Sequence, residues 1–172
     1  APRQGFVWVR RAFQVCARQP LGFAALLATC MFVVLLLGIV PVERAGSVVK
    51  RLLADDMWSG WGIRTLSSDH PAYNPFSYQR GSVWPHDNAT LAGGFRRYGY
   101  AAEAAQVAKA LFDAAEQFAG TRLPELFSGM PRVPASFPAP YLGANVPQAW
   151  AAGAIFRLVA ILCGIHATFE AG

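Results

Sequence analysis

The sequence predicts an all-α fold in which one long apolar helix precedes about four shorter helices joined by long loops. Three observations carry this prediction. An uncharged stretch covers residues 21–40, apolar residues recur with helical spacing in several later segments, and no segment alternates apolar and polar residues as a strand would. Amphipathic helices with their loops gathered at one end predict a toroid of helical hairpins whose site lies at the loop end.

The uncharged stretch, residues 21–40, lies between Pro20 and Pro41. About 20 apolar residues are enough to cross a bilayer as a helix. We therefore predict a single membrane span, in the inner membrane of a bacterium, with the N-terminus cytoplasmic because four arginines and no acid precede the span. A signal peptide and a buried helix of a large all-α core are the alternatives. The arginines are Arg3, Arg10, Arg11 and Arg18.

Charge and cysteine content exclude several classes of function. The net charge is +5, but residues after 41 hold eleven basic and ten acidic side chains, so no basic face is left for a nucleic acid. Cys16, Cys30 and Cys163 lack metal-ligand or redox spacing, and no glycine-rich phosphate loop is present. We predict no metal, no cofactor and no nucleic-acid partner.

Helices are expected at defined places after Pro41. Apolar residues recur with helical spacing from Val42 to Leu53, and this helix should end at Asp55. Residues 57–86 are rich in Gly, Pro, Ser, Asn and aromatic residues, which is typical of a long loop, and long loops often carry function. A second helix is predicted from about Asn88 to Tyr98, before Gly99.

The third helix, from about Ala101 to Phe118, has the clearest amphipathic pattern, and Gly120 should end it. A proline-bearing loop follows over residues 121–146. Asn145 is then expected to cap a last helix that has Pro147 in its first turn and runs to about His166. The predicted domains are residues 1–41, a juxtamembrane segment with the span, residues 42–167, a helical domain, and residues 168–172, a tail.

Glu125 is the first candidate for a catalytic group, because its neighbours in the sequence Leu-Pro-Glu-Leu-Phe are all uncharged. Pro124 restricts the chain before it, and the apolar neighbours Leu123, Leu126 and Phe127 are expected to raise the pKa of its carboxyl group. A carboxyl group in such a place is suited to general acid or base catalysis. An ordinary solvated loop glutamate is the alternative.

Aromatic and polar residues in the two long loops and at the start of the last helix predict a sugar site. Flat aromatic faces stack on a pyranose ring, while Arg, His, Asp and Gln bind its hydroxyl groups. Each of these residues has an alternative, structural role. Asp87 is suited to capping a helix N-terminus, the tryptophans to packing in the core, and Arg64 to bracing a loop. The predicted contacts are Trp58, Trp61, Arg64, Tyr78, Trp84, His86, Asp87, Gln148 and Trp150.

Five motifs in order over about 120 residues resemble bacterial amylo-α-1,6-glucosidase proteins. They are Ser-Gly-Trp-Gly-Ile-Arg, Tyr-Asn-Pro-Phe-Ser-Tyr, Gly-Ser-Val-Trp-Pro-His-Asp-Asn, Leu-Pro-Glu-Leu-Phe and Pro-Gln-Ala-Trp. These debranching-enzyme-like glycoside hydrolases have an (α/α)6 barrel, in a clan with trehalases, glucoamylases and mannosylglycerate hydrolases. Residues 1–41 weakly resemble the start of small bacterial multi-pass membrane proteins instead.

The resemblance implies an inverting glycosidase that acts on an oligosaccharide or α-glucan, with Glu125 as the general base and no cofactor. It also implies a cytoplasmic catalytic domain and an aspartate acid in an earlier motif that this sequence lacks. Four helices are a C-terminal portion of twelve, so a partner chain would have to complete the barrel, and Asp87 or that partner would supply the acid. The alternatives are a non-catalytic carbohydrate-binding or assembly remnant, and a membrane protein with a truncated barrel appendage.

Overall fold

The structure, a computed structural model, describes residues 38–165. Within this range it is all-α, as predicted, and isolated backbone bridges take the place of strands. No helix among these residues is long and apolar enough to span a membrane. The predicted span lies almost wholly outside the described range, as do most of the first domain and the tail. The helices are α3 (Val42–Leu52), α4 (Pro85–Arg97), α5 (Ala101–Gln117), the 3-10 turn η1 (Ala119–Thr121) and α6 (Ala149–Cys163).

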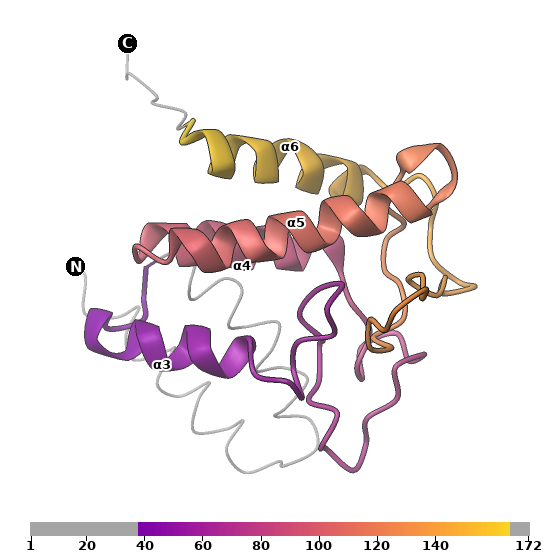
Figure 1. Ribbon diagram of the computed structural model, residues 1–172, viewed down its shortest axis with the longest axis horizontal. Helices are drawn as coiled ribbons and strands as arrows, with labels where there is room; N and C mark the ends of the chain where they lie inside the picture. The colour runs from indigo at the N-terminus through magenta and orange to yellow at the C-terminus, as the bar shows by residue number, and fades with distance from the viewer. Residues whose placement is uncertain (1–37, 166–172) are drawn as a thin grey trace, which may run out of the picture.

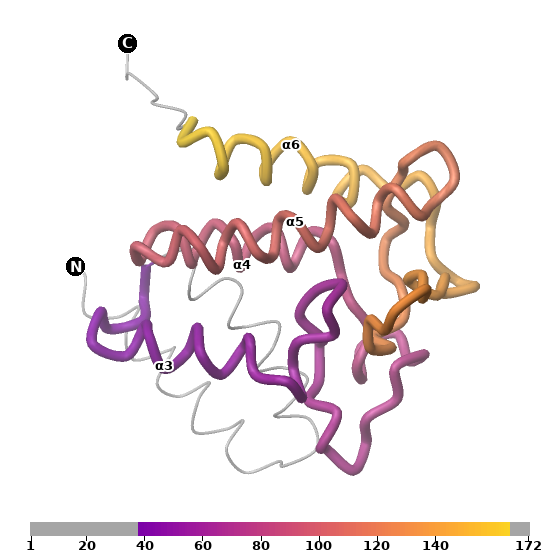
Figure 2. The backbone as a smooth tube through the Cα atoms, viewed as in Figure 1, coloured from indigo at the N-terminus to yellow at the C-terminus, as the bar shows by residue number. Residues whose placement is uncertain are grey.

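The helices α4 and α5 form an antiparallel hairpin that turns at Gly99, whose positive φ of 89° favours glycine. The helix α6 packs on both, and α3 lies on the other side of α4 (Figure 1). The loops 53–84 and 118–148 gather at one end of the helices, as Figure 2 shows. The loops therefore lie together at one end, as the sequence predicts.

The helical core consists of small and branched apolar side chains. Fully buried Leu91 and Phe95 of α4 share it with Leu111 of α5 and Leu158 of α6. Burying each such side chain contributes roughly 1.5–3 kcal/mol relative to exposure. Alanines on the same faces allow the helix axes to approach closely, so this apolar pattern fixes how α4, α5 and α6 pack. The buried alanines of these three helices are Ala89, Ala92, Ala104, Ala108, Ala110, Ala114, Ala115, Ala151 and Ala154.

The start of α4 differs from the prediction. It begins at Pro85 rather than Asn88, with Trp84 as the N-cap residue and no side-chain cap. Proline is favoured in the first turn because its fixed φ suits the helix and its missing N–H is not needed there. The N-cap alternative for Asp87 is therefore wrong, since Asp87 lies inside the first turn.

The start of α6 also differs. Gln148 is the N-cap residue, and its Oε1 accepts a hydrogen bond from the Ala151 N–H at 3.0 Å. The predicted cap, Asn145, lies three residues too early, and Pro147 precedes the helix rather than lying in its first turn. Those two predictions were wrong because the side chain of Asn145 bonds to Glu125 instead.

Backbone bridges join the two long loops. The Val83 N–H donates to the Phe127 carbonyl at 2.9 Å, and the Phe127 N–H donates to the Val83 carbonyl at 3.0 Å. Val83 is also bridged to Arg64, and Phe127 to Pro140. This pairing places the segment that carries Trp84 beside the segment that carries Glu125, although the two are about forty residues apart in sequence.

Candidate active site

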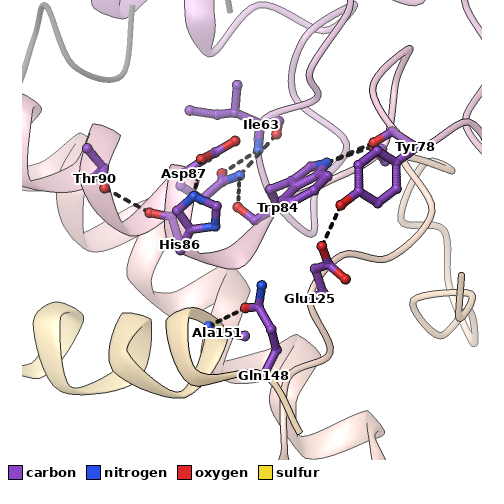
Figure 3. Close-up of polar contacts among 11 residues, drawn as sticks. Ile63, Tyr78, Trp84, His86, Asp87, Thr90, Glu125, Gln148 and Ala151 are labelled. Atoms are coloured by element: carbon purple, nitrogen blue, oxygen red, sulfur yellow. Dashed lines mark hydrogen bonds and ion pairs between the residues drawn. The ribbon is translucent and has the colours of Figure 1, made fainter. Parts of the chain in front are cut away.

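Glu125 lies at the loop end with its side chain enclosed, and the residue is only 6% exposed. One carboxylate oxygen, Oε1, accepts a hydrogen bond from the Tyr78 hydroxyl at 2.5 Å. The other, Oε2, accepts two from Asn145, one from its backbone N–H at 3.2 Å and one from Nδ2 at 2.7 Å. Figure 3 shows the carboxylate pointing toward Tyr78, near Trp84.

The sequence predicts a raised pKa for Glu125, and this prediction was wrong. The hydrogen bond from Tyr78 lowers the pKa below its usual value, and the hydrogen bonds from Asn145 and the charge of His86 act in the same direction. Burial opposes these effects but does not outweigh them. The carboxylate is therefore ionised at neutral pH, which suits a base rather than an acid.

Tyr78 is the donor to this carboxylate and keeps its proton. The hydrogen bond to Glu125, together with burial and the carboxylate charge, raises the pKa of Tyr78 to about 12. Its ring meets Trp84 edge to face, with 4.8 Å between centroids, and its carbonyl accepts a hydrogen bond from Trp84 Nε1 at 3.0 Å. Trp84 therefore holds Tyr78 at two points.

His86 and Asp87 lie next to this group, at the start of α4. His86 Nε2 is 2.7 Å from Asp87 Oδ1, and its ring lies 5.9 Å from Trp84 and 4.7 Å from Trp150, edge to face in both cases. The other ring nitrogen, Nδ1, is buried and has no hydrogen-bond partner within residues 38–165. Figure 3 shows Gln148 with its side-chain amide toward the same region.

The structure thus places six of the predicted contacts at the loop end. Tyr78 bonds to Glu125, and ring contacts lead from Tyr78 through Trp84 and His86 to Trp150. Among residues 38–165, no three His, Cys, Asp or Glu side chains are arranged to hold a metal ion. A buried, ionised carboxylate beside aromatic rings and polar side chains is suited to carbohydrate chemistry. The six are Tyr78, Trp84, His86, Asp87, Gln148 and Trp150.

The other three predicted contacts, Trp58, Trp61 and Arg64, lie near the start of the loop 53–84. Arg64, 4% exposed, donates from Nε to the Gly129 carbonyl at 2.8 Å, and from Nη1 to the carbonyls of Asp55 and Asp56. Trp61, 3% exposed, packs in the core below the Arg132 guanidinium, which lies 4.2 Å from the ring centroid. Trp58 packs against the same core. Arg64 therefore braces the loops, which is the alternative role that the sequence left open for it.

Two residues that matter here were missed by the sequence reasoning. Asn145 binds Glu125, whereas its position before Val-Pro was interpreted as a helix cap. Asn88 is buried, and its side chain accepts from the Ile63 N–H at 2.7 Å and donates to the carbonyls of Ile63 and Trp84. The position of Asn88 within the Trp-Pro-His-Asp-Asn motif was the available signal, but its partner lies 25 residues away.

Similar proteins were found by two kinds of comparison. The family described as the mannosylglycerate hydrolase MGH1-like glycoside hydrolase domain matches residues 7–128, a range that includes most of the predicted juxtamembrane segment and span. No curated protein matches. Among solved structures, the GH63 mannosylglycerate hydrolase from Thermus thermophilus in complex with Tris is 26% identical, with a TM-score of 0.55. That match covers 74% of this chain and 28% of the Thermus chain.

Two further structures from the same organism are similar. An uncharacterized conserved protein is 23% identical with a TM-score of 0.50, over 77% of this chain and 29% of the other. The same mannosylglycerate hydrolase in complex with glucose is 24% identical with a TM-score of 0.49, over 77% and 28%. The match to the Tris complex shows that the helices correspond to part of the GH63 (α/α)6 toroid. The chain belongs to the MGH1-like glycoside hydrolase family and spans little more than a quarter of the length of the solved relatives it matches.

Proposed function

We propose that this chain contributes a glycoside hydrolase site in which Glu125 is the general base. The observation that carries the proposal is the enclosed, ionised carboxylate held by Tyr78 and Asn145. A general base must be ionised at the working pH and must lie within reach of the water that it activates. Family membership supports hydrolysis of a glycosidic bond as the reaction.

The proposed reaction inverts the configuration of the sugar. Glu125 takes a proton from a water molecule, the water oxygen forms a bond to the anomeric carbon, and the glycosidic carbon–oxygen bond breaks on the opposite face. The departing oxygen takes its proton from a second carboxyl group, roughly 6.5–9.5 Å from the first in inverting enzymes. We assign that group to Asp87 or to a part of the barrel outside the described residues. Asp87 would have to act while paired with His86.

The sugar ring is proposed to lie against the aromatic residues beside Glu125. Trp150 is 66% exposed at the start of α6 and offers a ring face, with the His86 ring beside it. The Gln148 amide and His86 Nδ1 are groups of the kind that bind sugar hydroxyls. The five motifs favour an α-glucan or oligosaccharide of the debranching type. The GH63 relative acts on mannosylglycerate, and that substrate is the main competitor.

Activity assays test the proposal. The purified full chain would be assayed for glucose release from isomaltose, panose and limit dextrin, and for mannose release from mannosylglycerate. Glu125→Gln should lower the rate by about 10²–10⁴-fold, because the amide is no base. The matched control is Glu116→Gln, on the exposed face of α5, which should keep full activity. Equal rates for Glu125→Gln and the unchanged chain would exclude Glu125 as the base.

A second candidate function is sugar binding without turnover. It is favoured by the pairing of Asp87 Oδ1 with His86 Nε2 at 2.7 Å, which occupies the carboxyl group assigned as the acid. In this case tryptophan fluorescence should change on titration with maltose, isomaltose or mannosylglycerate, while no sugar is released. A chain that neither binds nor cleaves any of these would fit the third possibility, a barrel appendage on a membrane protein.

Attachment to an inner membrane through residues 21–40 is a separate proposal that rests on the uncharged stretch alone. An integral span should keep the full chain in the membrane pellet after washing at high salt and at alkaline pH. Release into the supernatant would instead favour a helix of the hydrolase domain, an interpretation that the family match over residues 7–128 supports.

A further inference from the structure

We propose that Asn145 and Tyr78 are positioning residues that give the two oxygens of Glu125 different roles. Asn145 fills the acceptor sites of Oε2, so this oxygen only holds the carboxylate in place. Tyr78 orients Oε1 and leaves it able to accept one more hydrogen bond, from the water that is to be deprotonated. The inference rests on the proposed function, in which Glu125 accepts a proton from water. It goes further by naming the reacting atom and the two side chains that select it.

The first observation is a three-point contact between Asn145 and Glu125. The Glu125 N–H donates to the Asn145 carbonyl at 3.1 Å, and the Asn145 N–H and Nδ2 both donate to Glu125 Oε2. A carboxylate oxygen has about two lone-pair sites. Two donors from one residue therefore fill Oε2 and fix the carboxylate relative to its own backbone.

The second observation is the single donor on Oε1. Within residues 38–165, Oε1 accepts one hydrogen bond, from Tyr78, and so has about one lone-pair site left for an O–H group. Tyr78 is itself held by Trp84 through a ring contact and a hydrogen bond. The position of Oε1 therefore depends on the loop that carries Tyr78, whereas Oε2 depends on the loop that carries Asn145.

The third observation is where Asn145 lies along the chain. It precedes the N-cap residue Gln148 by three positions, and Trp150 follows in the first turn of α6. The contact with Asn145 therefore links the orientation of Glu125 to two of the proposed sugar contacts. Loss of the Asn145 side chain should affect both the base and the start of α6, and loss of the Tyr78 hydroxyl should affect the base alone.

The charged and titratable groups around Glu125 determine what a titration should show. Tyr78 donates a hydrogen bond to Glu125, and the charge of His86, which is paired with Asp87, also acts on Glu125. Tyr141 acts on Tyr78, and 6.0 Å separates the centroids of their rings. The Tyr78 hydrogen bond is the largest cause of the lowered pKa of Glu125, and burial opposes it. Removing that hydroxyl should therefore raise the pKa.

The experiment is a pH titration of the Glu125 carboxyl carbon by NMR in the full chain, with the signal assigned by its loss in Glu125→Gln. We expect Tyr78→Phe to raise the pKa of Glu125, because the ring is kept and only the donor is removed. Asn145→Asp should raise it as well, because a second carboxylate then lies beside Oε2. The matched control, Tyr141→Phe, should leave the pKa unchanged, and circular dichroism would verify the fold of each variant.

An unchanged pKa of Glu125 in both folded variants would overturn the inference. An equal rise in Tyr141→Phe would also overturn it, because the effect would then not depend on the direct hydrogen bond. This readout needs no substrate, so it is independent of the proposed function. If the expected pKa changes appear while Glu125→Gln leaves hydrolysis intact, the positioning holds and the assignment of Glu125 as the base fails.

Discussion

Two clusters of aromatic and charged residues lie at the loop end, and their compositions are alike. The supporting cluster contains Trp58, Trp61, Arg64 and Arg132, and the site cluster contains Tyr78, Trp84, His86 and Glu125. In the supporting cluster both guanidinium groups are bound to the protein, since Arg64 donates to three carbonyls and Arg132 to the Asp113 carboxylate. In the site cluster, Glu125 Oε1 and His86 Nδ1 keep hydrogen-bonding capacity.

This difference indicates how to separate a scaffold from a site when both are rich in tryptophan and arginine. Buried charged groups cost free energy unless they are hydrogen-bonded, so a cluster whose guanidinium groups are bound to the protein stabilises the fold. A cluster with capacity left over is able to bind a ligand. Substitutions in the supporting cluster should therefore change the free energy of unfolding, and those in the site cluster should change sugar binding.

Trp61→Ala should have the largest effect on stability. The ring is 3% exposed, and truncation of a buried tryptophan costs about 3–5 kcal/mol. Urea denaturation would measure the loss, with Trp61→Phe as a milder control. Sugar affinity of the folded variant, followed by calorimetry, should stay the same. A lost affinity without a lost stability would move Trp61 into the site and break the comparison.

Arg64→Ala should destabilise the fold by about 3 kcal/mol, because three hydrogen bonds from a charged, buried donor to backbone carbonyls are lost. The control is Arg80→Ala, since Arg80 is exposed and the only hydrogen bond of its side chain among residues 38–165 goes to the Ser77 hydroxyl. That variant should lie within about 0.5 kcal/mol of the unchanged chain. Similar losses for the two arginines in the same urea titration would contradict the role of Arg64 as a brace.

Asp56→Asn should cost about 1–2 kcal/mol at pH 7 and nothing at very low pH. Hydrogen bonds from Arg51 and Ser67 lower the pKa of Asp56 to about 2, so its carboxylate stabilises the fold above the unfolded pKa of about 3.9. That contribution is lost as the pH falls through about 2. Thermal unfolding of both proteins between pH 7 and pH 2 should give curves that converge at the acid end. Curves that stay parallel would show that Asp56 acts through packing instead.

Trp150→Ala should have the smallest effect on stability, about 0.5 kcal/mol or less, because the side chain is 66% exposed. Sugar affinity should nevertheless fall by roughly 5–30-fold, as expected for the loss of a contact worth about 1–2 kcal/mol. Titration with the best ligand from the activity screen would measure it. Unchanged affinity would show that Trp150 does not contact the sugar, and Trp84 would then be the tryptophan proposed to contact it.

Local sequence patterns predicted the helices well where one face decides the structure. The predicted and observed bounds of α5 differ by one residue at the C-terminal end. Its apolar and charged residues lie on opposite faces of the helix, so only one face can pack against the core. The start of α6 was predicted less well. Asn145 and Gln148 are both able to cap a helix, and the choice depends on Glu125, twenty residues upstream, which binds the Asn145 side chain.

The site was predicted in its composition more than in its geometry. Nine contacts were named, and six of them lie near Glu125 or are joined to it through neighbouring rings. Arg64 and Trp61 were not separable from Trp84 by sequence, because all three lie in glycine-bearing loop motifs. Their burial depends on where Gly129 and Arg132 of the other loop lie.

The sequence by itself determined the all-α class, the order of the helices and the wider group of (α/α)6 glycoside hydrolases, because these follow from local periodicity and residue type. The comparison with family models gave the MGH1-like family, where the motifs had favoured amylo-α-1,6-glucosidase proteins. Only the tertiary structure decided the ionisation of Glu125 and the division between scaffold and site. The physical reason is that both depend on hydrogen bonds between residues far apart in the chain. Apolar neighbours in sequence predict a raised pKa for Glu125, but the hydrogen bond from the Tyr78 hydroxyl, 47 residues away, lowers it.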